Sequence, residues 1–360
     1  MRAAIAATSL PSTGRGPEAA ARPPARVSDA ALAAAGGGVP AELDGELGAS
    51  ARIRSRRDRK IPPDPTRPIG CFQEDEREPD GTLTPVLTVL LAGAECPFTC
   101  VFCDLWRRTL DGPTPRGAIP RQLATALREA GTLPPAGAAK LYNASNFFDA
   151  RAVPPQDDAA IAELLRPFHR VTVECHPRLV GRRCLEFAGR IPGRLEVAMG
   201  LESADPEVLA RLNKGMTLAD FERAAATLRR AGLGLRVFVL LPPPYVPAGQ
   251  AVESVLYSVN YAIDRGAAHV ALIPTRHGNG ELDDLRARGD SVPPTRGFID
   301  EVVERCEKVT ESVVTIDLWD IDRLAACPCC RPAWTARLRR FNRTGQSGSR
   351  VRCSACASSS

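Results

Sequence analysis

The sequence contains no run of about 18 uncharged apolar residues, and this absence excludes a membrane-spanning helix. Aromatic residues make up only 5% of the chain, and none occurs before Phe72. Residues 1–50 instead contain 15 Ala and 12 Gly plus Pro. Such a segment cannot bury enough apolar area to offset the entropy lost on ordering. We therefore predict that residues 1–60 form a disordered N-terminal extension that ends in a basic linker.

Acidic residues are absent after Asp322, although eight arginines follow that position. The whole chain has a net charge of +5, so the residues up to Asp322 carry a net charge of −3. This asymmetry predicts that residues 323–360 form a separate basic module. The basic linker before the core consists of Arg52, Arg54, Arg56, Arg57, Arg59 and Lys60. It is interpreted either as a solvated linker or as an arm that contacts a polyanion.

The sequence also lacks the regular spread of cysteines that a disulfide framework shows. Its twelve cysteines are concentrated in two clusters, and the others occur singly. This pattern is typical of metal sites in a reducing compartment, so we expect a cytoplasmic protein. The first ten residues are apolar, but the Pro-, Gly- and Ala-rich residues after them do not resemble an export cleavage site. The composition, 44% apolar and 25% charged, is that of a soluble globular protein.

Short apolar runs alternate with amphipathic stretches through the middle of the chain. The strand-like runs are Val86–Leu91, Lys140–Asn143, Val171–Cys175, Leu195–Met199, Leu235–Leu240 and Val270–Ile273. The helix-like stretches are Pro120–Ala130, Asp157–Leu165, Gly181–Ala188, Leu218–Ala231 and Val252–Arg265. This alternation predicts an α/β fold built from right-handed βαβ units. We expect a partial (β/α)6 TIM-like barrel over residues 61–322, with functional residues at the carboxyl ends of its strands.

The first cysteine cluster follows the first predicted strand, in Cys96-Pro-Phe-Thr-Cys100-Val-Phe-Cys103. A structural zinc ion needs four ligands, and the nearest other cysteine is Cys71, 25 positions upstream. A [4Fe-4S] cluster normally takes four thiolates, so three would leave one iron with an open position that holds a ligand. The alternative is a zinc ion that is bound by these three cysteines and takes Cys71 as its fourth ligand.

The spacing Cys-x3-Cys-x-aromatic-Cys, with Phe102 in the aromatic position, resembles the signature of radical S-adenosylmethionine (SAM) enzymes. The resemblance implies a [4Fe-4S] cluster on Cys96, Cys100 and Cys103 whose open iron binds SAM. It also implies reductive cleavage of SAM to methionine and a 5′-deoxyadenosyl radical. A second stretch, Val197–Met216, resembles the fourth and fifth units of the subgroup that includes the Elongator catalytic subunit, methylthiotransferases and the nitrogenase-cofactor maturase. The resemblance covers residues 85–320.

The same resemblance implies a set of SAM-binding residues. Phe102 would place a backbone group against the adenine, and Glu202 and Ser203 would reach the ribose and carboxylate. Lys214 would pair with the SAM carboxylate, and Glu174 matches an acidic residue common in the subgroup. The usual Gly-Gly-acidic motif of the second strand is replaced here by Leu141–Asp149, in which the candidates are Asn143, Ser145 and Asn146.

Other interpretations of these residues stay open. Glu174 and Glu202 end buried strands, where an unpaired carboxylate is costly, so we expect them to face a cavity. Lys214 could equally cap a helix instead of pairing with the SAM carboxylate. His176 and His277 are interpreted as plain loop histidines, with substrate contact as the alternative. Three single cysteines, Cys175, Cys184 and Cys306, are expected to be buried apolar residues.

Two further strings show a narrower resemblance. They are Tyr142 with Asn146-Phe147-Phe148-Asp149, and Leu240-Leu241-Pro242-Pro243-Pro244-Tyr245 after the fifth strand. Both resemble the archaeosine-biosynthesis radical SAM family, whose members cleave a C–N bond of a lysine attached to a 7-deazaguanine base in tRNA. The resemblance implies this type of chemistry.

The second cysteine cluster contains Cys327-Pro-Cys329-Cys330 and Cys353-Ser-Ala-Cys356, two Cys-x2-Cys pairs with 22 residues between them. This spacing is typical of a zinc ribbon, and predicts a zinc-ribbon-like module with Cys327, Cys330, Cys353 and Cys356 as ligands. A second iron–sulfur cluster and no metal are the alternatives. Between the pairs, arginines alternate with Trp334 and Phe341, which suits contact with phosphates and unpaired bases. Alternatively, the aromatic residues pack around the metal.

We therefore expect a radical SAM enzyme that modifies tRNA or another nucleic acid, with the basic tail as its docking module. One alternative is a radical SAM enzyme that acts on a small molecule or peptide. The other is a non-catalytic metal-binding protein. An enzyme of this kind needs an electron donor, which we expect to be a reductase or a flavodoxin or ferredoxin. We expect no membrane partner.

Overall fold

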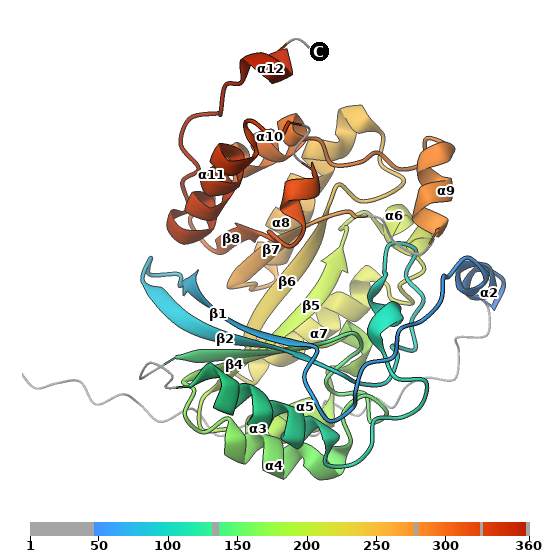
Figure 1. The fold of residues 1–360 in the computed structure, drawn as a ribbon, viewed down its shortest axis with the longest axis vertical. Helices are drawn as coiled ribbons and strands as arrows, with labels where there is room; N and C mark the ends of the chain where they lie inside the picture. Colours follow the sequence, from blue (N-terminus) through green and yellow to red (C-terminus); the bar gives the residue numbers. More distant parts are fainter. Residues whose placement is uncertain (1–46, 132–136, 277–279, 325–326, 358–360) are drawn as a thin grey trace, which may run out of the picture.

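The computed structural model describes residues 47–131, 137–276, 280–324 and 327–357. Its strands form one eight-stranded sheet in the order β1-β2-β3-β4-β5-β6-β7-β8. They are β1 (Gly70–Arg77), β2 (Leu83–Leu91), β3 (Ala138–Asn143), β4 (Arg170–Glu174), β5 (Arg194–Glu202), β6 (Gly234–Leu241), β7 (His269–Pro274) and β8 (Val313–Ile316). Only the pairing of β1 with β2 is antiparallel. The sheet curls into an incomplete barrel with helices outside it (Figure 1), as predicted.

The helices are α2 (Leu47–Ser55), α3 (Ala118–Ala130), α4 (Asp158–Leu164), α5 (Arg182–Ala188), α6 (Pro206–Arg211), α7 (Leu218–Arg230), α8 (Ala251–Asp264), α9 (Glu281–Ala287), α10 (Arg296–Cys306), α11 (Arg331–Thr344) and α12 (Ser354–Ala357). The predicted strands and helices are confirmed as β2 to β7 and as α3, α4, α5, α7 and α8. α7 begins with a capping box between Thr217 and Asp220. No helix in the described part of the chain is both long and apolar enough to cross a bilayer.

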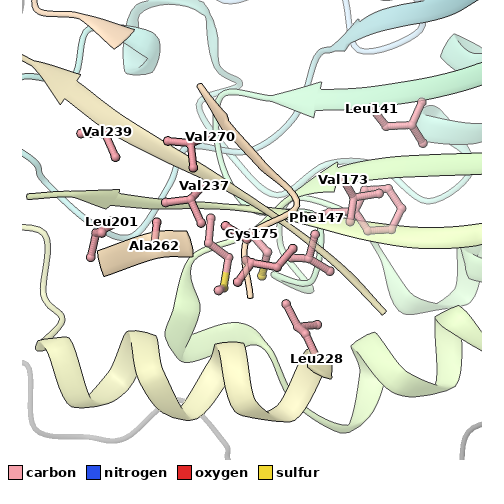
Figure 2. Close-up of a cluster of buried hydrophobic side chains, with 14 of the residues drawn as sticks. Leu141, Phe147, Val173, Cys175, Leu201, Leu228, Val237, Val239, Ala262 and Val270 are labelled. Atoms are coloured by element: carbon pink, nitrogen blue, oxygen red, sulfur yellow. The ribbon is translucent and has the colours of Figure 1, made fainter. Parts of the chain in front are cut away.

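Alternate strand residues point outward and form the main hydrophobic core with the helices. Figure 2 shows Val237 of β6 close to Ala262 of α8 and Val173 of β4 close to Phe147, in the cluster that also contains Leu228 of α7. Leu228 and Val237 are completely buried, and burial of such a side chain contributes about 1.5–3 kcal/mol to stability. The predicted burial of the single cysteines is confirmed for Cys175, Cys184 and Cys306.

The intervening strand residues point into the barrel, where those near the amino ends of the strands form a buried ion network. We define this interior ion network as Glu76, Lys140, Arg170, Glu196 and Arg236. Arg236 donates to Glu76 (2.9 Å) and to Glu196 (2.8 Å), while Arg170 donates to both carboxylates at 3.2–3.3 Å. Burial alone would raise the pKa of Glu196, but Arg236 and Arg170 outweigh burial and lower that pKa to about 2. The amino-terminal half of the barrel is therefore filled by paired charges.

Helix α11 spans the gap between the edge strands β1 and β8. Its Asn342 side chain bonds to the backbone N–H and C=O of Ile316, both at 2.8 Å, and its Arg343 pairs with Asp75 of β1 at 3.1 Å. Trp334, Leu338 and Phe341 on its inner face belong to the main core. The tail was predicted as a separate ribbon-like module. The structure differs, because α11 separates the cysteine pairs and packs on the barrel.

The predicted disorder of residues 1–60 is also corrected in part. Residues 1–46 lie outside the described residues, but residues 47–55 form α2, whose Ile53 is fully buried. Acidic groups of this chain pair with the basic run at 2.6–3.0 Å, in Arg52–Glu281, Arg56–Asp284, Arg57–Glu95 and Lys60–Glu95. These acidic partners lie far away in the sequence, so the local sequence of the basic run alone predicts a solvated linker.

Candidate functional site

The loop that carries the first cysteine cluster follows the carboxyl end of β2 and is anchored from two sides. Val101 N donates to Leu212 O (3.1 Å), and Asn213 Nδ2 donates to Thr99 O (2.8 Å). On the other side, the hydroxyl of Ser50 in α2 lies 2.7 Å from that of Thr99. Both the α6–α7 connection and α2 therefore fix the position of this loop.

Cys96, Cys100 and Cys103 are brought together in this loop, each of them partly buried. Burial raises the pKa of each thiol to about 12, so metal binding must displace their protons. Among the described residues, the three sulfurs are not a group compact enough for one ion. Thiolates of a [4Fe-4S] cluster bind separate irons, so they need not lie as close together as the ligands of one ion. Cys71 instead points its thiol at Ala126 O on α3 (3.8 Å), so nothing supports the zinc alternative.

Asn146 and His176 hold the cysteine loop against the end of β4. Asn146 Nδ2 donates to Cys96 Sγ (3.3 Å), and its Oδ1 accepts the backbone N–H of His176 (2.7 Å). The His176 ring stacks on Phe98 of the loop with centroids 3.7 Å apart. Its Nδ1 accepts from Arg178 N (3.2 Å), so Nε2 carries the proton and donates to Lys214 O (3.0 Å). Burial keeps the His176 pKa well below its usual value, and the ring is a neutral packing group.

Asn143 and Ser145 present unpaired polar atoms at the end of β3. Their side chains are 5% and 6% exposed, yet the Asn143 amide and the Ser145 hydroxyl have no hydrogen-bond partner within the described ranges. An unsatisfied buried polar group costs about 1–3 kcal/mol. Asn143 lies in register with Leu91, where the cysteine loop begins. These groups fit a polar ligand at this end of the barrel, such as the amino and carboxyl groups of SAM.

Glu202 and Lys214 form a buried ion pair at 2.8 Å, beside the same loop. Burial alone would lower the pKa of Lys214, but Glu202 and Cys100 outweigh burial and hold that pKa above its usual value. Glu202 ends β5 at a bulge with a φ of 67°. A Cβ at Gly200 would meet both the Glu202 carboxylate and the Lys214 ammonium, so this pair depends on glycine there. The contact of either residue with SAM stays a prediction.

The Glu174 carboxylate ends β4 and has no hydrogen bond or ion pair among the described residues. Burial raises its pKa to about 8, with Lys214 opposing the shift and Glu202 adding to it. Glu174 is therefore protonated at neutral pH and is able to donate a hydrogen bond to a ligand.

The other predicted SAM-binding residues have protein partners. The Ser203 hydroxyl accepts from Asp205 N (3.2 Å), and half-buried Phe102 packs in a small apolar cluster with Ile53 and Leu240. Their roles toward SAM stay predictions, as does that of Asn146. His277 lies outside the described residues.

The second cysteine cluster lies at the amino-terminal end of α11, where Cys327, Cys330 and Cys353 come together. The sulfur atoms of these three residues all lie within 4.8 Å of one another. The backbone of Cys356 belongs to α12, and its side chain lies outside the described residues. α2 lies beside the loop that follows β2, whereas α11 and α12 lie at the opposite side of the molecule (Figure 1).

Sequence reasoning missed the anchors of the cysteine loop. Thr99, Phe98 and Asn213 carry no chemical motif of their own, and their contacts cross more than 70 residues of chain. One signal was present: Asn213 precedes Lys214-Gly215, and a positive φ of 53° at Asn213 is a conformation that Asn tolerates better than most residues.

Comparison with known proteins agrees with this geometry. The family model of the radical SAM superfamily matches residues 91–246. Archaeosine synthase subunit beta of Methanosarcina acetivorans is 28% identical over 215 residues, which cover 56% of this chain and 61% of that protein. The subunit of the same name from Thermococcus kodakarensis is 30% identical over 128 residues, which cover 34% of this chain and 40% of that protein.

Among solved structures, a radical SAM methyltransferase from Sphaerobacter thermophilus superimposes with a TM-score of 0.44 and 16% identity. The superposition covers 78% of this chain and 82% of that one. The matched family segment contains the cysteine loop, the unpaired groups after β3 and the Glu202–Lys214 pair. Residues 91–246 of the chain therefore form a radical SAM domain, which indicates an enzyme of the radical SAM type.

Proposed function

We propose that this enzyme modifies tRNA by radical cleavage of a C–N bond, as the archaeosine-synthase resemblance suggests. The observation that carries the radical chemistry is the anchored loop with Cys96, Cys100 and Cys103. When bound, the [4Fe-4S] cluster and SAM supply one-electron cleavage of SAM to methionine and a 5′-deoxyadenosyl radical. The similarity to archaeosine synthase subunit beta supports the substrate class. The proposal includes a cytoplasmic location and a flavodoxin, ferredoxin or reductase as electron donor.

The chain's own residues bind and orient the reactants. Asn143 and Ser145 gain the hydrogen bonds that they lack when they receive polar groups of SAM. Lys214 presents a fixed positive charge for the SAM carboxylate, and Glu202 keeps Lys214 in place. Protonated Glu174 donates a hydrogen bond from the end of β4. Asn143, Glu174 and Glu202 end strands β3, β4 and β5, whereas Ser145 follows β3 and Lys214 lies in the α6–α7 connection. Functional residues of such barrels gather at the carboxyl ends of the strands.

The docking surface for tRNA is smaller than the count of tail arginines suggests. Arg337 pairs with Asp300 and Glu304, and Arg350 pairs with Glu304 at 2.7 Å. Among the described residues, three exposed arginine side chains of the tail have no ion pair, namely Arg339, Arg340 and Arg352. We propose that these three contact phosphates through their planar guanidinium groups.

Anaerobic reconstitution tests the radical chemistry. The protein should bind about four irons at the first cluster and form 5′-deoxyadenosine from SAM when a reductant is added. Replacement of Cys96, Cys100 or Cys103 with Ala should abolish both results, whereas Cys71→Ala is the matched control and should retain them. SAM cleavage by the triple Cys→Ala variant would exclude the assignment.

Mass spectrometry of tRNA nucleosides tests the substrate class. Bulk tRNA incubated with the reconstituted enzyme, SAM and reductant should lose one modified nucleoside and gain another, and the Cys100→Ala enzyme should leave it unchanged. If every tRNA nucleoside stays constant while 5′-deoxyadenosine forms, the proposed substrate is wrong. The enzyme then acts on a small molecule or peptide.

Salt-dependent binding tests the docking surface. Replacement of Arg339, Arg340 and Arg352 with Gln should lower tRNA affinity and reduce the slope of log affinity against log salt by about 2–3. The control replaces three exposed arginines in or just after α4 and α5, Arg166, Arg182 and Arg190, and should leave the slope unchanged. Equal slopes for both variants would place tRNA elsewhere on the protein.

A further inference from the structure

Three thiols of the tail have the spacing that one tetrahedral ion requires. Cys327 Sγ and Cys353 Sγ lie 3.9 Å apart, and both lie within 4.8 Å of Cys330 Sγ. A zinc ion with Zn–S bonds of about 2.3 Å places its sulfurs roughly 3.8 Å from one another. The arrangement therefore needs only small movements to bind one ion, in contrast to the wider cysteine loop after β2.

We propose that Cys327, Cys330 and Cys353 hold a structural zinc ion, with Cys356 as the fourth ligand. Cys353 and Cys356 repeat the Cys-x2-Cys spacing of Cys327 and Cys330. A closed shell of four thiolates is typical of structural zinc, since it leaves no position for a substrate or water. Exposed Cys329, which lies between Cys327 and Cys330 in the sequence, is the competing fourth ligand.

The surroundings of the cluster suit a site of negative charge. Arg296, at the start of α10, donates from Nη1 to Cys330 Sγ at 2.9 Å and from Nη2 to Val351 O. Four thiolates and one Zn²⁺ have a net charge of −2, which the Arg296 guanidinium partly balances. Hydrogen bonds of this kind fix ligand sulfurs in position. Cys330 is also the N-cap residue of α11, so its position is set by the helix.

The ion would connect the two ends of the segment that closes the barrel. Cys327 and Cys330 precede α11, and Cys353 follows the return of the chain after that helix. α11 packs between β1 and β8, so the zinc stabilises the seam of the barrel rather than the SAM site. The free energy of metal binding then contributes directly to the stability of this segment.

Metal analysis of the full-length protein tests the site. Protein purified without chelator and reconstituted with iron should contain about one zinc in addition to about four irons. Cys327→Ser and Cys353→Ser should reduce the zinc content at least tenfold and keep the four irons. Cys184→Ser, a buried single cysteine, is the control and should keep both metals. Retained zinc in the serine variants, or about eight irons and no zinc in the wild type, would overturn the proposal.

Cobalt substitution gives a second measurement that does not depend on the folding of a variant. The wild-type protein with Co²⁺ in place of zinc should show the intense visible bands of tetrahedral thiolate coordination. Weak octahedral bands would contradict the site. Cys356→Ser should weaken these bands strongly, whereas Cys329→Ser should leave them unchanged, and the opposite result would exclude Cys356 as the fourth ligand.

Discussion

Asn146 connects the first cysteine cluster to the end of β4, because its amide donates to Cys96 Sγ while its carbonyl oxygen accepts from the backbone of His176. The two bonds measure 3.3 Å and 2.7 Å. Both polar ends of Asn146 are thus used by the protein. Hydrogen bonds to ligand sulfurs stabilise the more negative, reduced state of an iron–sulfur cluster.

Asn146→Leu should therefore lower the reduction potential of the reconstituted cluster. The variant loses the N–H···S bond at nearly constant side-chain volume. A redox titration followed by electron paramagnetic resonance measures the shift. Asn342→Leu removes a half-buried amide at α11, away from the cysteine loop, and should leave the potential unchanged. An unchanged potential in Asn146→Leu would show that this bond does not act on the cluster.

Lys214→Met should destabilise the protein by about 3–5 kcal/mol, because it leaves the Glu202 carboxylate buried without its partner. The double variant Lys214→Met/Glu202→Gln removes both charges and should recover most of this free energy of unfolding. SAM affinity should stay low in both variants, since both lack the ammonium group. Denaturant unfolding and equilibrium binding of SAM measure the two effects. Wild-type SAM affinity in the double variant would rule out the proposed role of Lys214.

Glu174 should make stability depend on pH. Its pKa in the folded protein is about 8, against an ordinary value of 4.5. Between these values the folded state binds more protons than the unfolded state, so this group lowers stability as pH rises. Glu174→Gln removes the effect, so the variant should gain stability relative to the wild type between pH 5 and pH 9. Denaturant midpoints of both proteins at both pH values provide the test. If the midpoints of Glu174→Gln and the wild type differ by the same amount at pH 5 and pH 9, the raised pKa is contradicted.

Arg236→Met should cost about 3–5 kcal/mol, because Glu76 and Glu196 lose one of the two buried arginines that they share inside the barrel. Arg166→Met, which breaks an exposed pair with Glu163, should cost less than about 1 kcal/mol. Denaturant unfolding of the two variants makes the comparison. An equal loss of unfolding free energy in the two variants would mean that the interior ion network contributes little to stability.

The barrel strands and the cysteine loop could be predicted because their signals are local. The run Val86–Leu91 is apolar throughout, and the cysteine spacing lies within eight residues. β1 was missed since Gly70–Arg77 is mostly polar, and its Glu76 is buried only because Arg236 lies opposite. The tail arginines suited contact with phosphates because the tail itself has no acidic residue, whereas their acidic partners, such as Glu304, lie on α10. Pairing over such distances in sequence leaves no local pattern.

The interior ion network closes the amino-terminal end of the barrel and leaves only the carboxyl end open. Since Glu76, Arg170, Glu196 and Arg236 are at most 8% exposed, nothing passes through the amino-terminal half. Any ligand of the barrel interior must then enter and leave at the carboxyl end of the strands. If the substrate is the tRNA proposed above, a macromolecule bound across that end would block it, and SAM would have to enter first. Methionine and 5′-deoxyadenosine would then leave only after the macromolecule dissociates.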